Sequence, residues 1–502
     1  MGLSRLDGAI IAVYLAGITV FGLRFRKRQR SLRDYFLADR NIPWWAIALS
    51  IVAAETSTLT IVSIPGLAYD TNFGFLQVVF GYLAGRGIIV LLFIPQYFRG
   101  ELFTAYQLIE RRFGPRLRTL TSGLFLVLRA AAEGVRVFAV AIVVKVALGG
   151  ALSGMNDFGR DLAAITVVTL LTLVYTFEGG MTAVIWTDVA QLFIYIGGTL
   201  AGFFTILHLV PGGWNTVHAI AGEAGKFRIF DFTPDFFRTY TFWAGLIGGS
   251  FLTTASHGTD QLIVQRLLAA RSERQSKLAL LASGVMVLLQ FALFLLVGTM
   301  LFVFYKLVPP AVAFTKTDDI FPTFVVTRMP HGISGLLIAA ILAAAMSNLS
   351  AALNALSSAS VVDFYLRRHD EITEARRVLI SRTTTIFWGL VLFALAILSR
   401  HSGKVVEVGL SIASVAYGAL LGVFLLGVLT RRANERGAMA GMAFGFALEI
   451  FIWRGTRIPW TWYVSIGTAA TFLVGYAASL IAGTDERSHN ENRSAKHSGM
   501  RA

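Results

Sequence analysis

The sequence contains no cysteine and has few charged residues. Without cysteine the chain has no disulfide, no thiolate metal site and no cysteine nucleophile, and cysteine usage gives no indication of its redox compartment. Charged residues make up 15% of the 502 residues, against about 25% in an average soluble protein, whereas 55% are hydrophobic. This composition indicates a chain that lies in lipid.

Several functional motifs are also missing from the sequence. No glycine-rich loop ends in Lys-Ser or Lys-Thr, so ATP-driven pumping has no support. The eight histidines show no metal-binding spacing, and Gly-x-Ser-x-Gly is absent. The sequence therefore favours an ion-coupled carrier over an enzyme or a channel. A transporter-like sensor is the weaker alternative, because we expect no attached output module.

Apolar runs fill most of the chain and approach the roughly 20 residues that cross a bilayer. The first run follows no basic region and precedes no small-residue cleavage site, so it is predicted to be retained. We expect one transmembrane domain, residues 1–483, and a polar tail, residues 484–502. The thirteen predicted spans cover about 8–24, 44–70, 74–97, 119–150, 162–178, 185–210, 240–258, 278–306, 332–362, 380–399, 405–430, 437–453 and 462–482.

The distribution of basic residues predicts the orientation of the chain. Alternate loops, beginning with residues 24–33, hold about 28 lysines and arginines, and the loops on the other side hold about 12. This bias places the N-terminus outside and the tail in the cytoplasm, as expected for a multi-pass protein of the plasma (inner) membrane. It also explains the net charge of +15 without a nucleic-acid partner. No obligate protein partner is evident from the sequence.

The second span contains a polar cluster at mid-depth, in which Glu55, Thr56, Ser57, Thr58 and Thr60 precede a Pro-Gly pair. A carboxylate beside several small hydroxyl residues favours a locally opened helix, whose freed carbonyls could bind a cation. The alternative is a continuous helix in which the hydroxyls bond back to the main chain. The residues alone leave both interpretations open.

The ninth span places Ser347, Ser350, Asn354 and Ser357 on one helix face. These oxygens suit a hard cation, although small residues on such a face also allow close helix packing. The spacing by itself favours packing.

The fourth span places Arg129, Glu133 and Arg136 on one face, and the third span contains Arg86. Charges at mid-depth must face protein or water. The net charge of +1 on the fourth-span triad could attract an anionic solute, or the triad could hold neighbouring helices together. For Arg86, snorkelling or capping of the backbone is favoured over contact with a ligand.

Five stretches resemble the sodium/solute symporter family, whose members carry sugars, proline, sialic acid, pantothenate or monocarboxylates. They occur in the family's order: DYFLADRNIPWWAIALSIVAAETSTLT, TFEGGMTAVIWTDVAQ, DQLIVQRLLAARSERQSK, GLLIAAILAAAMSNLSAALNALSSASVVDFY and LLGVFLLGVLTRRANERGAMAGMAFGF. The resemblance implies an all-α fold of about thirteen transmembrane helices with a leucine-transporter-type core. In that core two inverted repeats of five helices, about 44–210 and 240–430, would place an opened second span beside the ninth.

The resemblance also implies a sodium site. Its ligands would be the carbonyls of Ala53, Thr56 and Ala344 and the side chains of Ser347 and Asn348. Asn348 departs from the Ser or Thr usual in the family. Asp188 and Ser350 match a second ion site or an ion exit route, but Ala351 replaces a further hydroxyl, so one sodium ion is favoured.

The solute site implied by the resemblance lies on three spans. Ser57, Thr60 and Arg136 resemble the arrangement in the sialic acid carriers, and Glu55 occupies the place of an aspartate in the proline carriers. Glu55 could tune cation binding, accept a proton or pair with an arginine such as Arg136. The seventh span lacks the asparagine and tyrosine of the sugar carriers and has instead Thr253, Ser256 and His257.

These residues predict a sodium-coupled symporter that imports a small organic solute, an organic anion, by alternating access. A sodium- or proton-coupled carrier of a neutral sugar or a zwitterion is the alternative. The expected partners are sodium, the solute and the lipid bilayer, with no cofactor besides the coupling ion. Tyr417 is a candidate gate, although a packing role is favoured for it.

Overall fold

A computed structural model of the protein describes residues 3–26, 41–99, 105–148, 152–175, 180–310, 313–365, 374–401 and 405–482. The predicted tail lies outside these ranges. Over the described residues the chain is helical, and its only extended pairing is an isolated bridge between Ile42 and Ala270. The predicted all-α fold class is confirmed.

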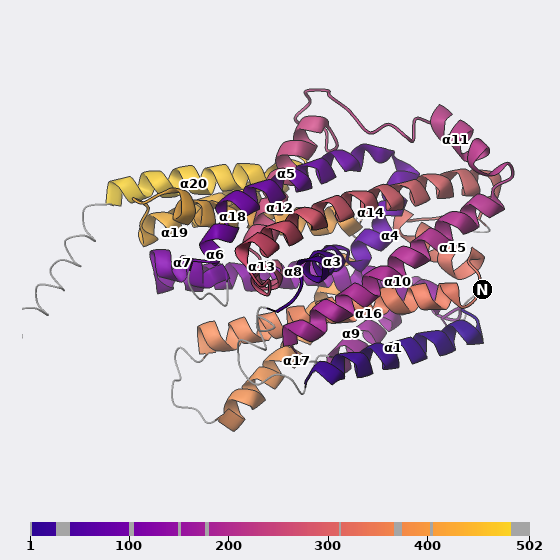
Figure 1. Ribbon diagram of the computed structural model, residues 1–502, viewed down its shortest axis with the longest axis horizontal. Helices are drawn as coiled ribbons and strands as arrows, with labels where there is room; N and C mark the ends of the chain where they lie inside the picture. Colours follow the sequence, from indigo (N-terminus) through magenta and orange to yellow (C-terminus); the bar gives the residue numbers. More distant parts are fainter. Residues whose placement is uncertain are drawn as a thin grey trace, which may run out of the picture.

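The helices of the first half of the chain lie among those of the second half (Figure 1). They are α1 (Arg5–Arg26), α3 (Trp44–Glu55), α4 (Thr58–Asp70), η2 (Phe73–Phe75), α5 (Leu76–Leu92), α6 (Ile94–Tyr97), α7 (Ala105–Phe113), α8 (Pro115–Ala147), α9 (Asp157–Tyr175), α10 (Gly180–Leu209) and α11 (Gly213–Glu223).

The second half begins with the π-helical turn η3 (Ala244–Gly248), which leads into α12 (Gly249–Gly258). The remaining elements are α13 (Gln261–Leu268), α14 (Glu273–Leu307), η4 (Thr317–Asp319), α15 (Ile320–Arg328), α16 (Ile333–Ala359), η5 (Ser360–Tyr365), α17 (Glu374–Leu398), η7 (Ser399–His401), α18 (Val405–Leu429), α19 (Glu435–Gly455), η8 (Trp460–Trp462) and α20 (Tyr463–Ala482).

Among the described residues, seven helices are long and apolar enough to cross a membrane, and the bent pair α3 and α4 makes up to eight. A multi-pass membrane protein is therefore supported, whereas the number of thirteen spans and the two inverted repeats remain predictions. The seven are residues 73–92, 184–209, 273–307, 333–357, 405–429, 435–455 and 460–481.

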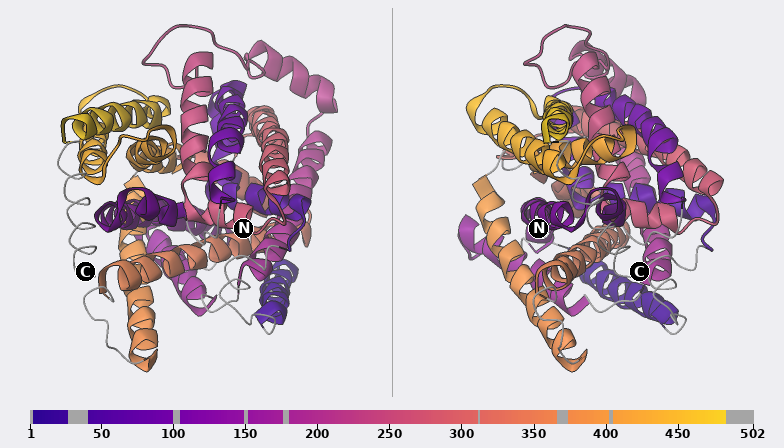
Figure 2. Two further views of the ribbon diagram at one scale, coloured as in Figure 1. Left: turned by 60° about the vertical axis from the view of Figure 1, so that its left-hand side comes forward. Right: turned by 90° about the vertical axis from the view of Figure 1, so that its left-hand side faces the viewer.

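The long helices run broadly along one axis, so the bundle has two ends (Figure 1). We call the end that carries the N-terminus, α11 and α15 the α11 end, and the opposite one the α7 end. Figure 2 shows α1 on one side of the bundle and the pair α19 and α20 on the other. The elements that carry the predicted site lie between them.

Glycines bring α5 and α12 into backbone contact. A Cβ atom on Gly81 would lie 2.8 Å from the Cα atom of Gly249, which is closer than carbon atoms approach in proteins. Only glycine at such positions lets the two helices pack this tightly. This packing places Arg86, the one charged residue of α5, beside His257 of α12.

Candidate functional site

The second predicted span is broken at mid-length. The axes of α3 and α4 meet at 65°, and Thr56 and Ser57 form the break. The opened helix predicted from the hydroxyl cluster is therefore confirmed. The continuous helix, which the sequence left open, is excluded.

The break frees main-chain oxygens on both of its sides. The Ser57 amide donates to the Glu55 carbonyl at 3.0 Å instead of to Ala53, and the Thr60 amide donates to Ser57 at 2.9 Å instead of to Thr56. The carbonyls of Ala53 and Thr56 thus receive no bond from the amide four residues ahead. Such uncoupled carbonyls inside a bundle can coordinate a cation.

The Thr56 hydroxyl already forms two hydrogen bonds. It donates to the Val52 carbonyl at 2.7 Å and accepts from Gln290 Nε2 of α14 at 2.5 Å. Only the main-chain carbonyl of Thr56 is left for an ion, as the predicted ligand set requires. Gln290 of α14, which was not predicted from the sequence, therefore holds the Thr56 side chain at the break.

A cavity of about 210 Å³ opens beside the break. It lies between the break, α8, α12, α16 and α18. Every predicted solute-site residue lines it, together with the gate candidate and one predicted ion ligand: Glu55, Ser57, Thr60, Arg136, Thr253, Ser256, His257, Tyr417 and Asn348.

The other predicted ion-site residues do not line this cavity. Ala53 and Ala344 are buried, Ser347 is half-buried on α16, and Asp188 and Ser350 are buried as well. The Asn354 side chain, expected on the Ser347 face, lies outside the described part of the chain. The predicted ion ligands and solute residues therefore form two groups that share Asn348.

A second, small cavity connects these groups. Its volume is about 10 Å³, and it is lined by Ser57 at the break, Glu133 and Arg136 of α8 and Asn348 of α16. Ser57, Arg136 and Asn348 line both cavities. Asn348 is thus the one predicted ion ligand that lines both cavities beside Arg136.

The charged face of α8 forms as its spacing predicts. Glu133 Oε1 lies 2.9 Å from Arg129 Nη2 and 2.6 Å from Arg136 Nη1. The net charge of +1 on this triad is compensated, however, because Asp260 Oδ2 lies 3.5 Å from Arg129 Nη1. Two arginines are balanced by two carboxylates.

Arg136 nevertheless keeps donors for a ligand. Both arginines line the cavity, but the side chain of Arg136 is 31% exposed and that of Arg129 is 8% exposed. The only described bond of Arg136 is the one to Glu133, and a guanidinium has five N–H donors in a fixed fork. Arg129 is thus held by two carboxylates, and Arg136 is the more accessible of the two arginines.

Arg86 is fully buried, so of the two roles favoured above it caps the backbone and does not snorkel. Its Nη2 atom forms an ion pair with Glu55 Oε2, and its Nη1 atom donates to the Tyr82 carbonyl at 3.2 Å. His257 Nε2 lies 3.3 Å from the same Glu55 oxygen. The arginine that pairs with Glu55 is therefore Arg86 and not Arg136.

Asp188 also has an arginine partner. Its Oδ2 atom accepts from Arg266 Nη2 at 2.9 Å and from Ser50 Oγ at 2.6 Å. Arg266 Nε also donates to Ser50 Oγ at 2.9 Å. A cation at Asp188 would have to share the Asp188 carboxylate with Arg266 and Ser50. This weakens the case for a second ion.

Tyr417 does more than pack. Its hydroxyl donates to Asp260 Oδ2 at 3.0 Å, and Asp260 Oδ1 caps the start of α13 through the Leu262 amide at 2.9 Å. Sequence reasoning missed Asp260 and Arg266. Asp260 directly precedes an apolar run, which is an N-cap signal that could have indicated it.

Comparisons with known proteins agree with this geometry. The family model described as the sodium:solute symporter family matches residues 35–445. The sodium/sialic acid symporter NanT of Aliivibrio fischeri is 29% identical over 466 residues, which are 92% of this chain and 90% of the relative. The human sodium/iodide cotransporter is 29% identical over 463 residues, 90% of this chain and 70% of the relative.

A solved structure supports the same assignment. It shows a Na⁺-coupled sialic acid symporter in a substrate-bound outward-open state, with 28% sequence identity and a TM-score of 0.82. The similarity covers 95% of this chain and 98% of the solved one. With a family model that spans most of its length, the chain belongs to the sodium:solute symporter family.

Proposed function

We propose that this protein is a sodium-coupled symporter that imports a small organic anion, specifically a carboxylate, by alternating access. The observation that carries the proposal is the half-exposed Arg136 in a cavity beside the broken helix. A guanidinium can bind a carboxylate through two parallel hydrogen bonds. Relatives named as sialic acid and monocarboxylate transporters support the same solute class.

Sodium is the proposed coupling ion. The carbonyls of Ala53, Thr56 and Ala344 and the side chains of Ser347 and Asn348 would hold it, and none of these groups titrates near neutral pH. Neutral oxygen ligands suit a hard monovalent cation. In this arrangement sodium stabilises the state that receives solute, and each ligand raises the affinity for the other by the same factor. Asp188 and Ser350 would line the exit route of the ion.

The proposed orientation places the α11 end outside the cell and the α7 end in the cytoplasm. It rests on the excess of basic residues in alternate loops. The repeats, about 44–210 and 240–430, would rock against each other around the fixed site. Sodium and solute would then enter from the α11 end of a protein in the inner membrane, with its N-terminus outside and its tail in the cytoplasm.

A solute panel with purified protein tests the function. A ligand that binds only the folded state raises the unfolding midpoint, and a sodium-coupled ligand does so mainly when sodium is present. We expect monocarboxylates or sialic acid to stabilise the protein in sodium but not in choline medium. Stabilisation by a neutral sugar alone, or equal stabilisation without sodium, would contradict the proposal.

A zwitterion is the second candidate solute class, because Glu55 also lines the cavity. An ammonium group could approach this carboxylate while the carboxylate of the solute binds Arg136. The ion pair with Arg86 already compensates the charge of Glu55, so the anion is favoured. Amino acids in the same panel decide between the two classes.

Replacing Ser347 by alanine should raise the sodium concentration for half-maximal stabilisation about tenfold, because one oxygen ligand is lost. Solute affinity at saturating sodium should change little, since Ser347 does not line the solute cavity. Ser360→Ala is the matched control, because its hydroxyl lies on η5, donates to the Leu356 carbonyl, accepts from Trp388 Nε1 and lines neither cavity. An unchanged sodium dependence in Ser347→Ala would show that the register assigned to α16 is wrong.

A further inference from the structure

The segment between α11 and η3, residues 224–243, folds into a closed loop at the α11 end; we call it the outer loop. Gln77 of α5 holds both of its sides, because its Oε1 accepts from the Asp231 amide at 2.9 Å and its Nε2 donates to the Tyr240 carbonyl at 3.2 Å. The Phe242 amide donates to the Asp231 carbonyl at 2.7 Å and closes the base. The outer loop is thus anchored on the helix that carries Arg86.

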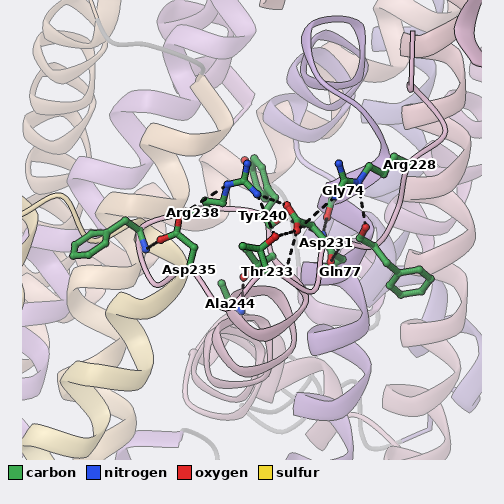
Figure 3. Close-up of polar contacts among 12 residues, drawn as sticks. Gly74, Gln77, Arg228, Asp231, Thr233, Asp235, Arg238, Tyr240 and Ala244 are labelled. Atoms are coloured by element: carbon green, nitrogen blue, oxygen red, sulfur yellow. Dashed lines mark hydrogen bonds and ion pairs between the residues drawn. The ribbon is translucent and has the colours of Figure 1, made fainter. Parts of the chain in front are cut away.

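Asp231 organises the outer loop (Figure 3). Its carboxylate accepts from the Thr233 amide at 3.1 Å and from Arg238 Nη1 at 2.8 Å, and Arg228 lies on its other side at 3.6 Å. The hydrogen bonds from Thr233, with the charges of Arg238 and Arg228, lower the pKa of Asp231. The carboxylate is therefore ionised at neutral pH and pairs with both arginines of the loop.

Tyr240 connects the outer loop to the second half of the chain. Its hydroxyl donates to Glu407 Oε1 of α18 at 2.6 Å. Its ring lies 5.8 Å from that of Phe75, which stacks on Phe291 at 5.4 Å and 12°. One side chain therefore contacts η2 through its ring and α18 through its hydroxyl.

These contacts lie directly behind one end of the solute cavity. Phe75, Phe291 and Val406 line the cavity, and Val406 immediately precedes Glu407. In the other direction the cavity extends to Tyr106 on α7 and Thr121 near the start of α8. The cavity thus reaches the α7 end, while the Tyr240 and Glu407 pair covers it toward the α11 end.

We propose that Tyr240 and Glu407 form the outer gate of the transporter, and that their hydrogen bond must break before solute can enter from the α11 end. The two side chains come from elements 167 residues apart in the sequence, so their separation requires movement of α18 relative to the outer loop. A hydrogen bond to a carboxylate is among the stronger ones, so this single bond can shift the balance of open and closed states by about tenfold. The proposal rests on the alternating-access function proposed above.

Cysteine labelling of the cavity tests the gate, because the protein has no cysteine of its own. Ala413→Cys places a single thiol at the cavity wall on α18. A membrane-impermeant thiol reagent is added to intact cells, where it reaches the α11 end, in sodium-free choline medium. We expect Tyr240→Phe and Glu407→Gln each to raise the labelling rate about tenfold, and the double variant to add little, because both single changes remove the same bond.

Tyr305→Phe is the matched control. Its hydroxyl is buried on α14 and has no hydrogen-bond partner among the described residues, so its loss should leave labelling unchanged. Equal labelling rates in Tyr240→Phe and the parent protein would overturn the proposed gate. Additive effects of Tyr240→Phe and Glu407→Gln on the labelling rate would overturn it as well. The effect of sodium on the labelling rate of the parent protein separates the proposed gate from the proposed sodium coupling. Labelling that rises with sodium but ignores Tyr240 refutes the gate alone, and labelling that never responds to sodium contradicts the proposed coupling.

Discussion

Arg136→Lys should weaken binding of a carboxylate solute about 100-fold at saturating sodium, because lysine cannot reproduce the two-pronged contact of a guanidinium. The sodium concentration for half-maximal stabilisation without solute should stay nearly constant. Glu133 holds Arg136 in place at 2.6 Å, so its remaining donors face the cavity in a fixed direction. Calorimetric or thermal-shift titration with the solute found in the panel measures both quantities.

Arg129→Lys provides the contrast for this experiment. Arg129 is nearly buried and lies between Glu133 and Asp260, so its replacement should lower stability more than solute affinity. If Arg136→Gln binds the solute as tightly as the parent protein does, the charged face of α8 is purely structural. The proposed solute class would then be wrong.

Arg86→Met should lower the free energy of unfolding by about 3 to 5 kcal/mol, because it leaves the Glu55 carboxylate without its arginine in the interior. The Arg86 side chain is 0% exposed and that of Glu55 is 12% exposed, so water can replace the guanidinium only in part. Glu55→Gln in the same protein removes the uncompensated charge and should restore most of the loss. Unfolding midpoints of purified protein measure these changes.

The control for this pair is Arg457→Met. Arg457 is exposed in the turn between α19 and η8, and a surface substitution of this kind changes stability by about 0.5 kcal/mol or less. An Arg86→Met protein that unfolds at the same temperature as Arg457→Met would show that the ion pair does not stabilise the fold. A double variant as unstable as Arg86→Met would show that packing of the arginine, and not its charge, matters.

Features within one helix could be predicted from the sequence. The cluster from Glu55 to Thr60 marked the broken span, since small hydroxyl residues beside a carboxylate compete with the helical hydrogen bonds. The three- and four-residue spacings of Arg129, Glu133 and Arg136 predicted one face, and the structure joins all three through Glu133. For the charged face the period of the helix is sufficient, whereas the hydroxyl cluster alone left a continuous helix possible and the family resemblance favoured the break.

Partners from different helices could not be predicted in this way. Glu55 and Arg86 are 31 residues apart, Asp188 and Arg266 are 78 apart, and Arg129 and Asp260 are 131 apart. Helical spacing says nothing about which charge a neighbouring helix presents. The compensation of the positive charge on α8 could not be predicted for this reason, because Asp260 belongs to the segment between α12 and α13.

For Arg86, backbone capping was predicted correctly, but its partners on other helices were not. An arginine inside an apolar span, considered alone, is expected to reach toward water. Close backbone packing of α5 on α12 instead buries it beside Glu55 and His257. The glycines that allow this approach are visible in the sequence, but their pairing across 168 residues is not.

Uptake of the solute that the panel identifies, into proteoliposomes that hold the purified protein, tests sodium-coupled symport most directly. An inward sodium gradient at equal pH on both sides should drive accumulation of the solute, and dissipating that gradient should abolish it. Accumulation driven equally well by a proton gradient in choline medium, with no sodium present, would contradict sodium-coupled symport.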